Sequence, residues 1–159
     1  MNRLVAYFSA GGSTARLANT LAAAAGAAVY EIRPAVPYAR GDLNWMDKKA
    51  RSTVEMADPN CRPAMADAAA PVAEADVIFL GFPIWWYREP ALIDTFLEAY
   101  DLAGKTIVPF FTSGGSQLGE GQGRIGKLAK GAKVLSGKRF PARASESELR
   151  SWIDGLRLE

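Results

Sequence analysis

Short, almost wholly apolar runs alternate along this chain with segments of helical spacing, and this alternation restricts the possible folds more than any other feature. Five runs predict strands, at residues 4–8, 28–32, 77–80, 106–111 and 132–135. The first, third and fourth are apolar at nearly every position and contain β-branched or aromatic residues, as is typical of strands covered on both faces. The sequence therefore predicts an α/β fold built on a parallel sheet.

Helical spacing fills most of the intervals between these runs. Residues 14–25 are rich in Ala and Leu, residues 90–100 carry an apolar stripe after a proline, and residues 145–156 open with capping-box spacing. A further helix is expected at about 39–56, before an irregular segment that reaches residue 75. Pro109 conflicts with this scheme, because a proline cannot donate a hydrogen bond within a central strand.

Histidine is absent from the chain, and Cys61 is its one cysteine. A Ser-His-Asp triad, a Cys-His dyad, a His-ligated metal centre, an internal disulfide and a CxxC redox pair are therefore excluded. The length of 159 residues predicts a single domain over residues 1–159. No apolar run reaches the roughly 18 residues that a membrane span needs. The sequence also lacks a signal-peptide pattern, and we expect a cytoplasmic protein.

Ligands of open parallel sheets bind beyond the carboxyl ends of the strands, so candidate chemistry is sought where each run ends. The first run ends in Ser9-Ala10-Gly11-Gly12-Ser13-Thr14, directly before a helix. Glycines leave backbone amides bare, hydroxyls add donors, and the amino terminus of the helix adds partial positive charge. This loop fits a phosphate site held mainly by neutral donors, although a simple turn with a helix cap would have the same composition.

The third run leads into an aromatic loop, Pro83-Ile84-Trp85-Trp86-Tyr87-Arg88-Glu89-Pro90. Three consecutive large aromatic residues cannot all point into one core, so at least one should face a crevice or a partner. A flat heteroaromatic ligand stacked on the loop would explain the pattern. A partly buried loop or a dimer contact is the alternative. The fourth run ends in a third loop of small residues, Thr112-Ser113-Gly114-Gly115, which could equally be a flexible surface segment.

Together, the three loops resemble those of the flavodoxin family. The first is similar to its FMN phosphate loop, S/T-x-T-G-x-T, and the second and third are similar to the P-I-W-W and T-S-G-G-S segments of one branch. The resemblance implies a three-layer flavodoxin-like sandwich: a five-stranded parallel sheet of order 2-1-3-4-5 with helices on both faces. It also implies FMN as the cofactor. By resemblance, Ser9, Ala10, Gly11, Gly12, Ser13 and Thr14 hold the phosphate, Pro83, Ile84, Trp85, Trp86 and Tyr87 line the isoalloxazine, and Thr112, Ser113, Gly114 and Gly115 meet the other edge of the flavin or its ribityl chain.

Two positions depart from the family pattern. Gly11 replaces a threonine of the phosphate loop and removes one hydroxyl donor, and Tyr87 stands where the branch often has glycine. Both departures could weaken FMN binding. They are the basis for one alternative, a non-catalytic module that keeps the fold.

Two other motifs are not assigned a function. Residues 121–126 match GxGxxG, but they lie about ten residues after the fourth run, whereas a dinucleotide loop follows its strand directly. The run from Arg124 to Ser145 contains seven Lys or Arg residues and no carboxylate. A solvated helix face and an edge strand explain it better than nucleic-acid binding, because lysines discourage pairing at a sheet edge.

The resemblance predicts an FMN-dependent oxidoreductase that passes electrons from NAD(P)H or a redox partner protein to a quinone-like or protein acceptor; a homodimer is possible. The alternative within this class is a one-electron flavodoxin-type shuttle. Shuttles rely on an easy peptide rotation at a glycine near the flavin, yet no glycine lies between Gly81 and Gly104. Bulky residues disfavour positive φ. On this ground the sequence favours two-electron chemistry.

Overall fold

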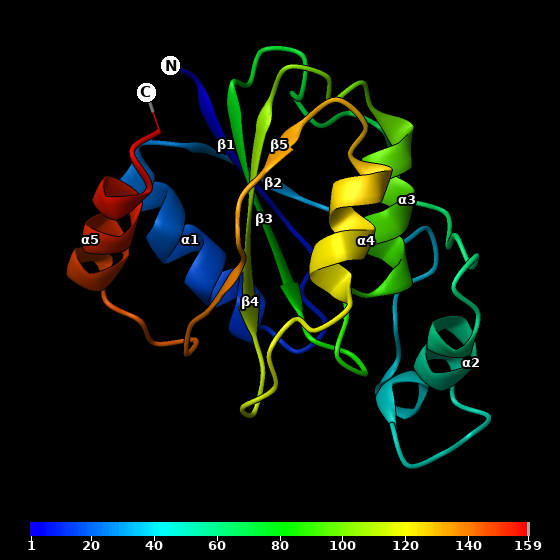
Figure 1. The fold of residues 1–159 in the computed structure, drawn as a ribbon. Coiled ribbons are helices and arrows are strands. Elements are labelled where there is room, and N and C mark those ends of the chain that lie inside the picture. The colour runs from blue at the N-terminus through cyan, green and yellow to red at the C-terminus, as the bar shows by residue number, and fades with distance from the viewer. Residues whose placement is uncertain (159) are drawn as a thin grey trace.

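The computed structural model describes residues 1–158 and contains one mainly parallel sheet between two helical layers (Figure 1). The strands run in the order β2-β1-β3-β4-β5, and a short β6 also pairs with β4. All these pairings are parallel. The predicted strand order and layers are confirmed. The strands are β1 (Arg3–Tyr7), β2 (Ala28–Glu31), β3 (Val77–Pro83), β4 (Thr106–Thr112), β5 (Lys133–Val134) and β6 (Lys138–Arg139).

Helices cover both faces of the sheet. On one face α1 and α5 pack over a cluster that includes Leu17, Leu21, Phe79 and Leu149. On the other face α3 and α4 cover a cluster that includes Phe96. Figure 1 shows α1 and α5 on the left of the sheet and α3 and α4 on the right. The helices are α1 (Ser13–Ala25), α2 (Arg51–Ala57), α3 (Ala91–Ala99), α4 (Gly121–Leu128) and α5 (Glu146–Leu156), with one 3-10 turn, η1 (Arg40–Leu43).

The edge strand is divided into β5 and β6 opposite Pro109. The carbonyl oxygens of Ile107 and Phe111 accept hydrogen bonds from Leu135 and Phe140, so alternate residues of β4 face this edge. Pro109 shares that orientation and has no N–H to donate. The edge strand is interrupted at this point, between Val134 and Lys138. The proline therefore stays in β4 because its missing donor faces a gap in the sheet.

The prediction of one helix at about 39–56 is wrong. The structure has only η1 and α2 in this region, and the segment between them is irregular. The Asn44 side chain accepts a hydrogen bond from the amide of Met46, and Asp47 accepts one from the amide of Lys49. Such side chains offer the backbone an alternative to helix hydrogen bonds. No helix of residues 1–158 combines the length and the hydropathy required to cross a bilayer.

Candidate functional site

A cavity of about 330 Å³ lies at the carboxyl ends of β1, β3 and β4. All three loops that the sequence singled out reach it: the end of β4 contributes Thr112 and Ser113, the loop after β3 contributes residues 83–85, and the loop after β1 contributes Ala10, Gly11, Ser13 and Thr14. The segment before α5 closes a further side through residues 140–142. Three segments far apart in the sequence therefore form one site, as the open-sheet rule predicts.

The loop after β1 has the geometry of an anion site. The Ser9 hydroxyl oxygen accepts hydrogen bonds from the amides of Gly12 and Ala15, at 3.1 Å each, and this folds the loop back on itself. Gly12 has φ of 94°, a conformation that glycine adopts without strain. Within residues 1–158, the amides of Ala10, Gly11, Ser13 and Thr14 donate to no protein group. A phosphate could accept hydrogen bonds from these free amides, which lie beside the amino terminus of a helix.

Thr14 joins this loop to the end of β4. Its side chain is 2% exposed, and its hydroxyl lies 2.8 Å from the hydroxyl of Thr112. If Thr112 donates in this pair, the Thr14 hydroxyl proton remains free to bind an anion in the cavity. Gly11 is exposed, has no positive φ, and would have open space around an added Cβ. Its backbone therefore does not require glycine.

The aromatic loop forms a tight two-residue turn. The amide of Trp85 donates to the carbonyl of Arg88 at 3.1 Å, and the amide of Arg88 donates back at 3.2 Å. The two central residues, Trp86 and Tyr87, have φ of 50° and 63°. Such turns normally carry Asn-Gly, and each bulky residue held there costs on the order of 1–2 kcal/mol. Both bulky residues therefore adopt the positive φ that is unfavourable for them, without a glycine in the turn.

The three consecutive aromatic residues have different environments. Trp85 is half-buried and packs edge-on against Phe8 and Tyr38, with ring centroids 5.6 and 5.5 Å apart. Trp86 and Tyr87 are 40% and 66% exposed. Trp85 thus packs partly against the protein interior, whereas its two neighbours are more exposed.

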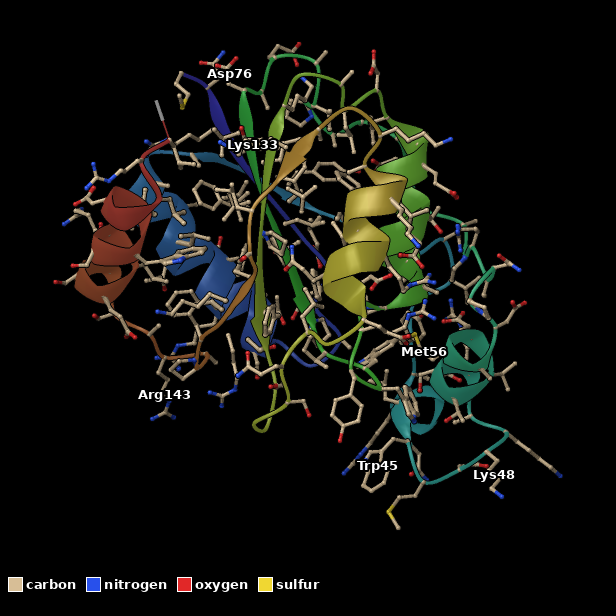
Figure 2. All side chains as sticks on the ribbon, in the orientation of Figure 1. Trp45, Lys48, Met56, Asp76, Lys133 and Arg143 are labelled. Atoms are coloured by element: carbon tan, nitrogen blue, oxygen red, sulfur yellow. The ribbon has the colours of Figure 1, made fainter. Side chains whose placement is uncertain are left out.

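A second cavity, of about 490 Å³, adjoins the first through the shared lining residues Ile84 and Trp85. Trp86 and Tyr87 form part of its wall, and Trp45 forms another part from the irregular segment before α2. Trp45 is 71% exposed, and Figure 2 shows it projecting from that segment. Its role in the site was missed, because the segment carries no periodic pattern that would place a single tryptophan. The lining is completed by Leu43, Ser52 and Ser116.

The loop after β4 is held by Arg139 of β6, whose guanidinium donates to the carbonyl of Ser113 at 3.1 and 3.3 Å. The Ser113 hydroxyl donates to the carbonyl of Ser116 and accepts from the amide of Gly115. Among the site residues proposed from the sequence, Gly12, Gly114 and Gly115 line neither of the two cavities. Ser9 lines neither of them: it lines a third cavity, next to β2, and its hydroxyl stabilises the phosphate loop by accepting the hydrogen bond from Gly12.

Comparison with known proteins supports this architecture. Residues 2–156 match the family model described as flavodoxin. The chain belongs to the flavodoxin family. A protein of Bacteroides eggerthii assigned to the flavoproteins is 44% identical, with a TM-score of 0.93 and 99% of each chain covered. A protein of Bacteroides uniformis with the same assignment is 43% identical, with a TM-score of 0.90. The match covers 96% of this chain and 97% of that protein.

A more distant flavodoxin-like structure shows the same fold. A flavoprotein of Lactobacillus acidophilus, crystallised in complex with FMN, is 19% identical, with a TM-score of 0.70, and covers 96% of this chain and 98% of its own. Among curated proteins, no sequence matches this flavodoxin.

The residues of this flavodoxin fit FMN chemically. Free amides and hydroxyls at the start of α1 suit a phosphate dianion, and the second cavity offers aromatic walls to a flat ring system. Within residues 1–158, no group of His, Cys, Asp and Glu side chains is arranged to hold a metal ion.

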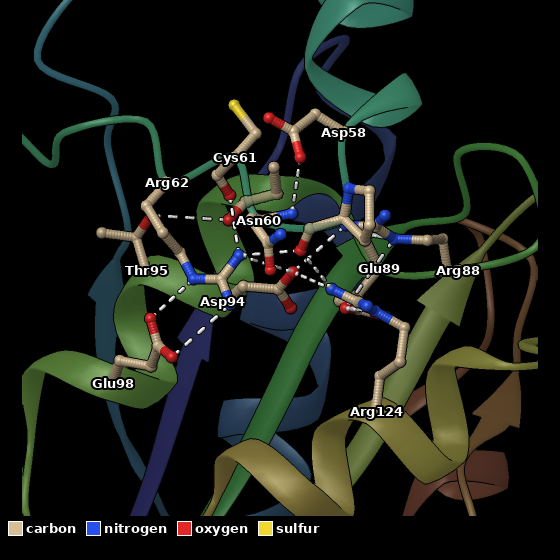
Figure 3. Close-up of polar contacts among 12 residues, drawn as sticks. Asp58, Asn60, Cys61, Arg62, Arg88, Glu89, Asp94, Thr95, Glu98 and Arg124 are labelled. Carbon is tan, nitrogen blue, oxygen red and sulfur yellow. Dashed lines mark hydrogen bonds and ion pairs between the residues drawn. The ribbon is translucent and has the colours of Figure 1, made fainter.

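Directly after the aromatic turn, a buried charged cluster follows that the sequence did not reveal (Figure 3). Glu89 and Asp94 are both 0% exposed. Arg124 of α4 donates to Glu89 at 3.0 Å and to Asp94 at 2.6 Å, and Arg88 donates to Asp94 at 3.1 Å. Arg62 lies 3.7 Å from Asp94 and binds Glu98 more closely.

The pKa of one of the two buried carboxyl groups, that of Glu89, is raised. Within residues 1–158, Glu89 Oε1 and Asp94 Oδ1 are buried without a hydrogen-bond partner. Burial, a hydrogen bond with Asp94 and the negative charge of Asp94 together raise the pKa of Glu89 to about 8. Because this pKa lies above 7, we interpret Glu89 as protonated at neutral pH.

The GxGxxG segment has a structural explanation. It forms α4, and a Cβ on Gly121 would lie 2.8 Å from Glu89 Oε1 and 3.1 Å from Arg88 Cα. Gly121 is therefore needed for the close approach of α4 to the charged cluster. Of the lysines in the basic run, Lys127 lies on α4 and Lys133 and Lys138 lie on the edge strands, as the sequence suggested, whereas Lys130 lies in the turn after α4.

Proposed function

We propose that this protein binds FMN at the carboxyl ends of β1, β3 and β4 and uses it as an oxidoreductase, passing electrons from NAD(P)H or a redox partner protein to a quinone-like or protein acceptor. The observation that carries the proposal is that two cavities at this edge share Ile84 and Trp85 in their linings. One is lined by neutral anion donors and the other by aromatic side chains. FMN has this same division into a phosphate and a flat heteroaromatic ring.

Each part of the site has a role in this proposal. The free amides of Ala10, Gly11, Ser13 and Thr14, with the hydroxyls of Ser13 and Thr14, would bind the phosphate. Trp86, Tyr87 and Trp45 would contact the ring system and exclude water from it. Thr112 and Ser113 would offer hydrogen bonds from the end of β4. Bound FMN would supply the redox chemistry, because it exchanges either single electrons or a hydride.

The second cavity also supports a neutral acceptor. Its lining contains Leu43, Ile84, four aromatic residues and two serines, but no charged side chain. A charged substrate would lose hydration there without gaining a partner. A flat, uncharged acceptor such as a quinone therefore fits the walls best.

The experiment is the visible absorption spectrum of freshly purified protein, followed by addition of FMN to flavin-free protein. We expect absorption in the blue that is released on denaturation, and NAD(P)H-dependent reduction of a soluble quinone. If flavin-free protein takes up neither FMN nor riboflavin, the non-catalytic alternative replaces this proposal.

A one-electron shuttle remains the second candidate, and the turn geometry favours it. Trp86 and Tyr87 already have positive φ, so the absence of glycine is no obstacle to the backbone conformations that shuttles use. A stepwise anaerobic reduction followed by absorption separates one-electron from two-electron behaviour. A single domain over residues 1–159, a cytoplasmic location and a homodimer stay predictions from the sequence.

A further inference from the structure

Arg88 links the strained turn to the buried charged cluster. It closes the turn through its own backbone, donating to Trp85 and accepting from it. Its side chain, however, points away from the cavities: the residue is 4% exposed, and its guanidinium donates to Asp94 of α3 at 3.1 Å and to the carbonyl of Glu89 at 3.3 Å. One residue therefore belongs both to the ligand-facing turn and to the interior.

The turn needs such an anchor. Trp86 and Tyr87 hold positive φ without being glycine, and they are 40% and 66% exposed, so their own packing fixes this conformation only in part. Strained backbone of this kind persists only where surrounding contacts over-determine it. The contacts available are the Arg88 guanidinium on one side and the close approach of Gly119 to the carbonyl of Tyr87 on the other.

The anchor point is itself rigid. Asp94 Oδ2 accepts from Arg88 and from Arg124, and Arg124 also binds Glu89. Charge-assisted hydrogen bonds of this type are the stronger ones in proteins, and burial shields them from screening by salt. Figure 3 shows the guanidinium groups of Arg88 and Arg124 converging on the two carboxyl groups. The cluster therefore connects the turn to both α3 and α4.

We propose that Arg88, held by the buried Glu89–Asp94 pair, is a positioning residue that keeps Trp86 and Tyr87 in the left-handed turn that presents them to the flavin. Its role at the flavin rests on the proposed function, whereas its control of the turn does not. Arg88 touches no ligand in this proposal. It acts through the backbone of the two residues before it.

The first test is hydrogen exchange of the flavin-free protein. In Arg88→Met, the amides of Trp85 and Arg88, whose hydrogen bonds close the turn, should exchange at least about tenfold faster, which corresponds to about 1.4 kcal/mol of local opening. The strands β1 and β4 should keep their protection. Arg62→Met is the matched control: it also removes an arginine that faces Asp94, but Arg62 does not belong to the turn. It should leave exchange at Trp85 and Arg88 unchanged.

Arg88→Lys provides a second variant, because it keeps the charge but loses the forked contact to Asp94 and the carbonyl of Glu89. We expect an intermediate acceleration, and this variant carries the test if Arg88→Met does not fold by circular dichroism. A uniform loss of protection across the whole sheet would show a merely structural role and overturn the proposal. Equal exchange at the turn in parent and variants, or an equal effect of Arg62→Met, would also overturn it.

The second test concerns the ligand. Arg88→Met should weaken FMN and riboflavin by the same factor, about tenfold, because the turn faces the ring and not the phosphate. Unchanged affinities in a variant whose turn exchanges faster would refute the presenting role. If the parent protein binds neither flavin, the proposed function fails, and the exchange experiment still decides whether Arg88 holds the turn.

Discussion

The raised pKa of Glu89 makes stability depend on pH in an unusual direction. The pKa of Glu89 is raised from its ordinary 4.5 to about 8 in the folded protein. Between these values the folded chain binds one proton more than the unfolded chain. The free energy of unfolding should therefore be highest at the acid end of this range and fall as pH rises, with no further loss above about pH 8.

The slope follows from linkage. One proton corresponds to about 1.4 kcal/mol for each pH unit, so the free energy of unfolding should drop by about 3 kcal/mol between pH 5 and pH 7. Few other side chains titrate between pH 5 and pH 7, because the chain has no histidine. Carboxyl groups whose pKa values are lowered, such as those of Asp67 and Glu98, lose their contribution at more acid pH.

The assay is urea unfolding of flavin-free protein at half-unit steps from pH 5 to pH 8, followed by tryptophan fluorescence. Glu89→Gln is the decisive variant: its amide can donate to Asp94 in place of the proton but does not titrate. We expect the slope to disappear in this variant, and its stability at pH 8 to exceed that of the parent. A parent whose stability is flat or rises between pH 5 and pH 7 would refute the raised pKa of Glu89.

Three further predictions concern the flavin site. Thr14→Val should weaken FMN by about 1.5–3 kcal/mol and riboflavin less, since only FMN carries the phosphate; equal losses in titrations of both flavins would contradict the phosphate assignment, and Thr20→Val on the same helix is the control. Gly11→Thr should tighten FMN by about 1 kcal/mol, because the added side chain meets open space and restores a hydroxyl donor; isothermal titration calorimetry checks this, and an affinity no tighter than that of the parent argues against it. Trp86→Ala should relieve much of the quenching of bound FMN fluorescence at unchanged stability, whereas Trp85→Ala should mainly lower the melting temperature, because Trp85 packs in the interior; the reverse pattern would show that their roles are exchanged.

The features that could be predicted from the sequence are those whose residues are neighbours in the chain. Each proposed ligand loop directly follows a strand, so the loops after β1, β3 and β4 could be placed at one sheet edge from the order of apolar runs alone. Pro109 shows the limit of a single-residue rule. It is incompatible with a fully paired central strand, yet the sequence does not show that the edge strand opposite would be interrupted.

The parts that could not be predicted depend on contacts between distant segments. Trp45 reaches the second cavity from a segment without periodicity, and only the fold shows which wall it forms. The charged cluster brings Arg124 to Glu89 and Asp94 across 35 and 30 residues. The sequence around Arg88 and Glu89 carries no pattern that shows both residues to be buried.

The charged cluster and the aromatic turn depend on each other. Two bulky residues at positive φ are a local conflict, and local conflicts that persist in a fold mark sites where another demand is met. Here the conflict occurs at the residues that face the second cavity, and its resolution lies in the next residue, Arg88, whose side chain enters the interior. A glycine at the turn would remove the strain, but it would also remove the aromatic wall. The buried ion cluster is thus what allows aromatic side chains, rather than glycine, to stand at this point of the proposed flavin site.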